Sequence, residues 1–167
     1  MKDTIEDFVI TRQFAAPREL LFRAWTEADR LAAWWGPTGF SLLCAQLDLR
    51  PGGLFHYCMR AAAGIEMWGR FVYREIAAPE RLVFVNSFSD ADGNIVRSPF
   101  SAEWPLEVLN TITFAEHEGA TTITLRGHPI DVIDAERDAF AAAHPSLEQG
   151  FKGTLDRLDA YLAAQSQ

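Results

Sequence analysis

The sequence predicts an α+β protein in which an antiparallel sheet is covered by one long C-terminal helix. From about Phe8 to Gly127 the chain consists of short strand patterns separated by turns. From Ser146 to Ala164 the pattern is that of one amphipathic helix, because apolar residues recur every three or four positions: Leu147, Phe151, Leu155, Leu158 and Leu162. A sheet and a helix with such faces bury them on each other, and a curved sheet would leave space for a small molecule between them.

The N-terminal part of the chain predicts a strand followed by two short helices. Phe8 to Phe14 alternates in the manner of a strand. Pro17 suits a first helical position, and helical patterns follow at about 19–26 and 27–34. The second pattern ends before Gly36-Pro37, so the pair forms a connection between the first strand and the rest of the sheet.

Six further strand patterns lie between these short helices and the long one. They cover 40–49, 54–60, 66–76, 81–88, 107–114 and 121–126. Most of the turns between them are short, which favours antiparallel pairing in a sheet of about six or seven strands. Both faces of the 40–49 strand carry apolar residues, so the sequence does not decide which face points towards the core.

Two segments interrupt this regular order. Ser89 to Pro105 holds an Asp-Gly pair, two prolines and an isolated Trp104, and therefore reads as a long loop, which we expect to act as a lid. A short helix from about Asp134 to Ala143 is interrupted by His144-Pro145, because a residue before proline avoids the helical region.

Composition excludes several classes of function. The 167 residues include 15 basic and 23 acidic side chains, a net charge of −8, and neither a repeat nor a linker divides them. We therefore expect a single domain over residues 1–167, with no nucleic-acid partner and no membrane association. The acidic N-terminus does not resemble a signal peptide, so we expect a cytoplasmic protein, either a monomer or a homodimer.

No motif in the chain points to a metal or a cofactor. The four histidines have no partner at metal-ligand spacing, and Asp90, Asp92 and Asn94 fit a polar turn better than a calcium loop. We therefore expect neither a metal nor a cofactor. Whether the protein is an enzyme stays open; a catalyst in the same cavity would use Tyr57, Glu66 or His128 as its acid or base.

Several aromatic and amide side chains are candidates for contact with a ligand. Asn86 and Asn110 lie on apolar strand faces, where an amide needs a hydrogen bond or nearby water; a local bond to the backbone explains them equally well. Trp34 and Trp35 suit an anchor for the two short helices better than a cavity wall. The residues that we expect to line a ligand site are Tyr57, Met59, Trp68, Asn86, Trp104, Asn110, Phe151 and Leu155.

The order of several segments resembles a known family. These segments are FVITRQFAAPRELLFRAWTEADRLAAWWGP, LRPGG, YREIAAPERLVF and SLEQGFKGTLDRLDAYL. Together they are similar to the heat-shock protein 90 ATPase activator-like family of the START-like (SRPBCC) superfamily. The resemblance implies a helix-grip fold, in which a curved antiparallel sheet wraps around the long helix and leaves a cavity between them.

The same resemblance leaves the function open, because the superfamily includes lipid carriers, hormone receptors, polyketide cyclases and a co-chaperone domain. We expect a protein that binds a small, mostly apolar or aromatic molecule between the sheet and the C-terminal helix, with no committed catalysis. The alternatives are a cavity enzyme of the cyclase, hydrolase or isomerase type, and a chaperone-interacting module.

Overall fold

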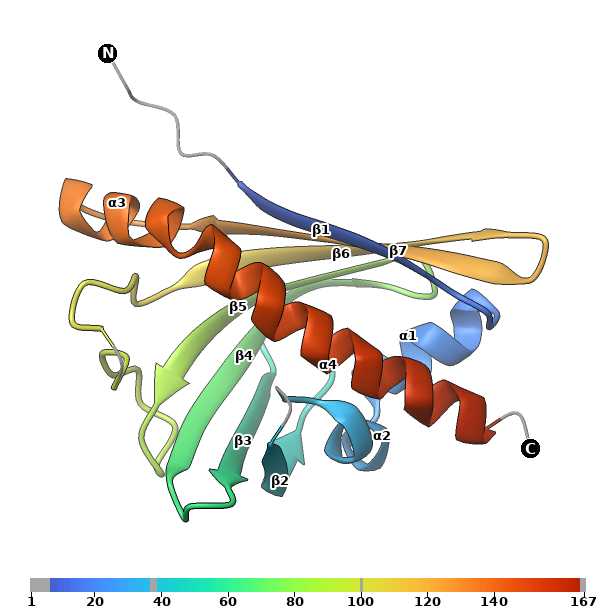
Figure 1. The fold of residues 1–167 in the computed structure, drawn as a ribbon, viewed down its shortest axis with the longest axis horizontal. Helices are drawn as coiled ribbons and strands as arrows, with labels where there is room; N and C mark the ends of the chain where they lie inside the picture. The colour runs from blue at the N-terminus through green and yellow to red at the C-terminus, as the bar shows by residue number, and fades with distance from the viewer. Residues whose placement is uncertain (1–6, 37–38, 100, 166–167) are drawn as a thin grey trace.

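The computed structural model describes residues 7–36, 39–99 and 101–165, and the predicted α+β architecture is confirmed (Figure 1). Seven antiparallel strands form one sheet in the order β1-β7-β6-β5-β4-β3-β2. The strands are β1 (Phe8–Phe14), β2 (Phe40–Leu47), β3 (Leu54–Ala61), β4 (Glu66–Ala77), β5 (Arg81–Ser89), β6 (Val108–His117) and β7 (Ala120–Pro129). This arrangement, with one long helix across the sheet, is the helix-grip fold.

The sheet curls around the long helix instead of lying flat. In Figure 1 β3 and β4 descend at a steep angle to β1, β6 and β7, and the long C-terminal helix runs diagonally in front of β4 and β5. The strand register shifts between Leu42 and Cys44 in β2, and between Tyr73 and Glu75 in β4. Such bulges bend a strand and increase its twist, and so contribute to the curl.

The bulge in β2 also explains why this strand is apolar on both faces. Phe40 and Leu42 pack against the core before the bulge, and Ala45 and Leu47 pack against it afterwards. One extra residue reverses the alternation of side chains, so the inward face changes sides within the strand. Leu43, at the shift, is exposed.

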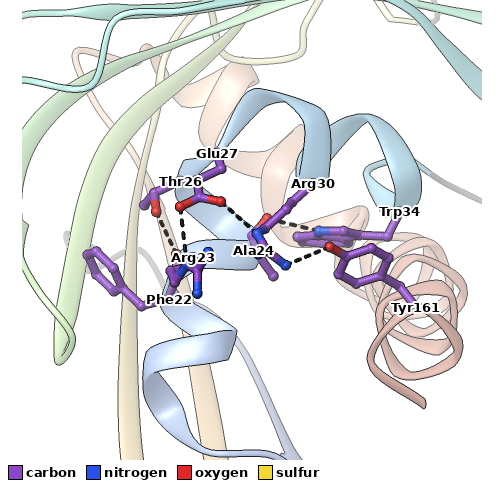
Figure 2. Close-up of polar contacts among 8 residues, drawn as sticks. All are labelled: Phe22, Arg23, Ala24, Thr26, Glu27, Arg30, Trp34 and Tyr161. Atoms are coloured by element: carbon purple, nitrogen blue, oxygen red, sulfur yellow. Dashed lines mark hydrogen bonds and ion pairs between the residues drawn. The ribbon is translucent and has the colours of Figure 1, made fainter. Parts of the chain in front are cut away.

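Two short helices, α1 (Arg18–Thr26) and α2 (Ala28–Trp34), are held by an indole anchor. Trp25 and Trp34 are fully buried, with ring centroids 4.8 Å apart in an edge-to-face arrangement. The Trp34 Nε1–H donates a hydrogen bond of 3.0 Å to the Ala24 carbonyl (Figure 2). Trp34 thus satisfies its polar atom within the helix pair and serves as an anchor.

An arginine connects this helix pair to the long C-terminal helix. Arg30 donates to Glu27 Oε1 at 2.6 Å and to the Tyr161 hydroxyl at 2.9 Å (Figure 2). Glu27 lies in extended conformation between the two short helices and also accepts from Arg23 at 3.2 Å. The hydrogen bond from Arg30 stabilises the Glu27 carboxylate and is the main reason that its pKa is lowered.

The two C-terminal helices, α3 (Asp134–Ala142) and α4 (His144–Gln165), are almost continuous. The predicted interruption is limited to Ala143, and the Leu147 N–H already donates to the Ala143 carbonyl at 2.8 Å. Pro145 lies in the first turn of α4, where its missing N–H costs no helical hydrogen bond. Among the described residues, no helix has the length and apolar composition needed to cross a membrane.

The long connection between β5 and β6 is tied to α3 at two points. Arg97 donates to the buried Glu136 at 2.5 Å and to the Trp104 carbonyl at 3.0 Å. The Trp104 ring packs on Phe140, with ring centroids 5.4 Å apart. The connection is therefore fixed over the end of the sheet where α3 meets α4.

The two hydrogen bonds in Figure 2 that involve Trp34 and Tyr161 give a matched pair of variants. We expect Trp34→Phe to lower the free energy of unfolding by about 2–3 kcal/mol, because it opens a cavity and leaves a buried carbonyl without a donor. Tyr161→Phe, in a partly buried position, costs less than about 1 kcal/mol. Urea unfolding of both variants measures the difference. Equal losses would show that the indole hydrogen bond is not the anchor.

The Arg97–Glu136 pair predicts a pH-dependent attachment of the β5–β6 connection. Arg97, and then the Ile133 N–H, lower the pKa of Glu136 in the folded protein below its unfolded value. The contribution to stability is therefore complete above the unfolded pKa and is lost as the pH falls through the lower, folded pKa. Arg97 is half exposed, so we expect a coupling of about 1 kcal/mol or less.

A double-mutant cycle with Arg97→Gln and Glu136→Gln measures this coupling. We expect the coupling free energy between Arg97 and Glu136 to be present at about pH 7 and to decrease towards about pH 3. Amide exchange around Trp104 should accelerate in either single variant. A coupling that does not change with pH, together with unchanged exchange, would show that the ion pair does not hold the connection.

Candidate functional site

A pocket with a volume of about 450 Å³ lies between the sheet, the β5–β6 connection and the N-terminal half of α4. Its size falls in the lower part of the range of about 300–1,000 Å³ that is usual for small-molecule sites. The described residues that line it are Trp35, Gly36, Tyr57, Met59, Met67, Trp68, Gly69, Asn86, Ser87, Phe88, Ser98, Ser101, Trp104, Ala143, Ser146, Leu147, Gly150, Phe151 and Thr154.

Small side chains on α4, and Ala143 directly before it, border this space. Ala143, Ser146, Gly150 and Thr154 recur every three or four residues and all line the pocket. A Cβ added to Gly150 would meet no atom within 4 Å. The C-terminal half of the same helix carries leucines instead, and it buries Leu155, Leu158 and Leu162 in the core. One helix thus closes the core with its second half and leaves a hollow beneath its first half.

A glycine in β4 makes room for a tyrosine on the floor of the pocket. Gly69 pairs with Tyr57 of β3, and a Cβ at position 69 would lie 2.5 Å from the Tyr57 hydroxyl oxygen. No side chain fits there without displacing the ring. The absence of a side chain at Gly69 therefore sets the position of the Tyr57 hydroxyl.

Three polar groups lie together at this floor. The Asn86 Nδ2 donates to the Arg70 carbonyl at 3.1 Å and to the Tyr57 hydroxyl at 3.4 Å. The ring of Trp35 packs edge-on to Tyr57, with ring centroids 6.1 Å apart. Burial raises the pKa of Tyr57, against smaller opposing effects of Asn86 and of the Trp35 N–H, so the phenol stays protonated. The Trp35 Nε1–H itself closes no hydrogen bond of normal geometry among the described residues.

Six of the eight residues expected to contact a ligand border the pocket: Tyr57, Met59, Trp68, Asn86, Trp104 and Phe151. The β3–β4 register places Trp68 opposite Cys58, on the face that Tyr57 does not share. Its ring stacks on His56, with ring centroids 5.2 Å apart.

Asn110 and Leu155 do not line the pocket. The Asn110 Nδ2 donates to the Val108 carbonyl of its own strand at 3.2 Å, and its Oδ1 lies 3.4 Å from where a Cβ on Gly127 would be. This is the local backbone bond that was the alternative explanation for a buried amide. Leu155 is 2% exposed and belongs to the core.

The tryptophan pair divides into two roles. Trp34 is the buried anchor of the short helices, as expected from the sequence. Trp35 lines the pocket and contacts the aromatic floor, with its ring centroid 5.2 Å from that of Phe71. At the end of a helix, two adjacent side chains point in different directions. Sequence periodicity alone did not show which of the two tryptophans faces the pocket.

Sequence reasoning missed the small residues of α4 and the serines Ser98 and Ser101 of the β5–β6 connection. A signal for the helix residues was present, because Ala143, Ser146, Gly150 and Thr154 have helical spacing beside the leucine stripe. For the two serines no periodic signal exists, since they lie in an irregular segment.

Of the three acid–base candidates, only Tyr57 reaches the pocket. Glu66 is exposed and pairs with Arg60 at 2.5 Å. His128 lies within β7, is 42% exposed and contacts Asp7 Oδ1 through Nδ1 at 2.7 Å. Within the described part of the chain, no cluster of three or more His, Cys, Asp or Glu residues could hold a metal ion. Among the described residues that line the pocket, the only acid–base group is the Tyr57 phenol, whose pKa burial raises.

Comparisons with known proteins agree with this geometry at the level of the fold. The structure is similar to protein Ms6760 from Mycobacterium smegmatis, with 26% identity, a TM-score of 0.76, and coverage of 93% of this chain and 90% of that one. Protein NE0264 from Nitrosomonas europaea is 20% identical, with a TM-score of 0.77 and 99% coverage of both chains. The AHSA1 protein from Silicibacter pomeroyi is 22% identical, with a TM-score of 0.73 and coverage of 96% and 99%.

A comparison with curated proteins found no match to this chain. The model of one protein family matches residues 15–163, which include both short helices, six of the seven strands and nearly all of α4. This chain therefore belongs to the family described as Activator of Hsp90 ATPase homolog 1-like protein.

Proposed function

We propose that this protein binds a small, mostly apolar molecule in the pocket beneath the N-terminal half of α4, without acting on it chemically. The observation that carries the proposal is the run of small residues from Ala143 into α4, which borders a hollow of about 450 Å³ with mostly apolar walls. A helix selected only for stability would fill this space, as the second half of α4 does.

The character of the wall supports an apolar ligand. Met59, Met67, Phe88, Leu147 and Phe151 are among the apolar residues that line the hollow, and its polar side chains are uncharged. Burial against such walls contributes about 25 cal/mol per Å² of apolar surface removed from water. Affinity should therefore follow the apolar area of the ligand and depend little on salt.

A second candidate is an interaction with a chaperone ATPase, which the name of the family favours. The surface gives it less support. The large exposed hydrophobic residues come from separate segments of the chain: Val9, Leu43, Leu49, Ile65, Val96, Leu106 and Ile133. Retention of an Hsp90-type ATPase on the immobilised protein, with a change in its hydrolysis rate, would favour this candidate over ligand binding.

Native mass spectrometry of the freshly purified protein is the most direct test of ligand binding. We expect a bound species with the mass of a small molecule, which is released on unfolding. If the spectrum shows the bare protein alone, binding of an added fluorescent apolar probe decides whether the pocket accepts a ligand.

Filling the pocket from the helix gives a variant that separates binding from stability. We expect Gly150→Leu to abolish the fluorescence enhancement of the neutral probe N-phenyl-1-naphthylamine, because the new side chain enters the empty space beside position 150. The free energy of unfolding should rise by about 0.5–1 kcal/mol, since glycine is a poor helix former.

The matched control is Gln149→Leu, which adds the same side chain at an exposed neighbouring position of α4 that does not line the pocket. This variant should bind the probe like the parent protein. Equal enhancement by the parent protein and by Gly150→Leu, or none by the parent protein, would contradict the proposed site.

A further inference from the structure

We propose that the ligand is uncharged and flat, and that it carries a hydroxyl or N–H group that both donates and accepts a hydrogen bond at the Asn86–Tyr57 floor. This inference rests on the proposed binding function and narrows the class of ligand to neutral aromatic molecules of the phenol or aryl-amine type. Three features of the pocket support it.

The first feature is the absence of charge on the wall. Among the described residues that line the pocket, none is Asp, Glu, Lys, Arg or His. The nearby guanidinium groups bond elsewhere: Arg97 pairs with Glu136, and Arg157 donates to the carbonyls of Gly36 and Phe40 at 2.9 and 3.0 Å. An ionised carboxylate or phosphate would lose its hydration in this pocket and gain no counter-charge.

The second feature is the fixed orientation of the Asn86 amide. Its nitrogen donates to the Arg70 carbonyl, and a carbonyl can only accept, so the NH₂ side of the amide must face that strand. The Oδ1 atom then points away from it and accepts no hydrogen bond from the described residues. Asn86 lines the pocket and is only half-buried, so it offers an acceptor to a ligand.

The third feature is the Tyr57 hydroxyl beside it. This oxygen accepts from Asn86, while its own proton has no acceptor among the described residues. Because the group stays protonated, it can donate to a ligand oxygen or nitrogen. An acceptor and a donor therefore stand side by side, which matches a single hydroxyl group that donates to Asn86 and accepts from Tyr57.

The rest of the wall favours a flat molecule with this polar edge. Met59 and Met67 are flexible and polarizable, and Trp35 and Phe151 present aromatic surfaces. A fused-ring phenol buries its apolar faces on these side chains and turns its one polar group to the floor.

Competition with N-phenyl-1-naphthylamine tests the inference with three probes of similar size: 2-naphthol, 2-methylnaphthalene and 2-naphthoate, at neutral pH. We expect 2-naphthol to bind about tenfold more tightly than 2-methylnaphthalene, which lacks the donor. The anionic 2-naphthoate should bind at least about 100-fold more weakly than 2-naphthol. Similar affinities for all three, or preference for the anion, would overturn the inference while leaving the binding function intact.

Three variants test whether Tyr57 and Asn86 cause the preference for 2-naphthol over 2-methylnaphthalene. Tyr57→Phe keeps the ring and removes the donor, and Asn86→Leu removes the acceptor; each should reduce the 2-naphthol preference to about threefold or less. Asn110→Leu removes the other strand amide, which lies outside the pocket, and should leave the preference unchanged. An undiminished preference in Tyr57→Phe, which is the change least able to disturb folding, would refute the assignment. Failure of every probe to bind the parent protein would instead refute the proposed function.

Discussion

The structure depends on one constraint: a single helix has to cover a sheet that curls. A straight helix touches such a surface closely over part of its length only, so the size of its side chains decides whether the remainder is filled. In α4 the leucines at 155, 158 and 162 close the core over the region held by the short helices. The smaller residues at 146, 150 and 154 of α4, and Ala143 directly before it, line the pocket.

Most of the architecture was predictable because local patterns agree with it. The alternation of Phe8 to Phe14, the turn chemistry between strands and the leucine periodicity of α4 each follow from a face that must be buried. The inward face of β2 was not predictable, because the bulge between Leu42 and Cys44 leaves no clear mark in a strand that is apolar on both sides. Likewise, Ala143 alone separates α3 from α4, although His144-Pro145 suggested a wider break.

The site was less predictable than the fold. Tyr57 and Asn86 were found because a polar atom on an apolar face needs a partner, and the same reasoning selected Asn110, whose partner is its own backbone. Trp68 borders the pocket, but the sequence does not give the register that places it opposite Cys58 and stacks its ring on His56. The small residues beside the hollow were not predicted, because they leave space and carry no reactive or binding group. Gly150, for example, has no side chain at all.

The separation of α4 into a packing half and a spacing half has an evolutionary consequence. The small residues at 146 and 150 border the hollow and lie outside the buried core, so substitutions there can change the shape of the hollow while Leu155, Leu158 and Leu162 keep the core closed. A hollow of different shape on the same framework then needs only single exchanges between small and large residues along successive turns of this helix. A scaffold built in this way tolerates low sequence identity while its three-dimensional outline persists.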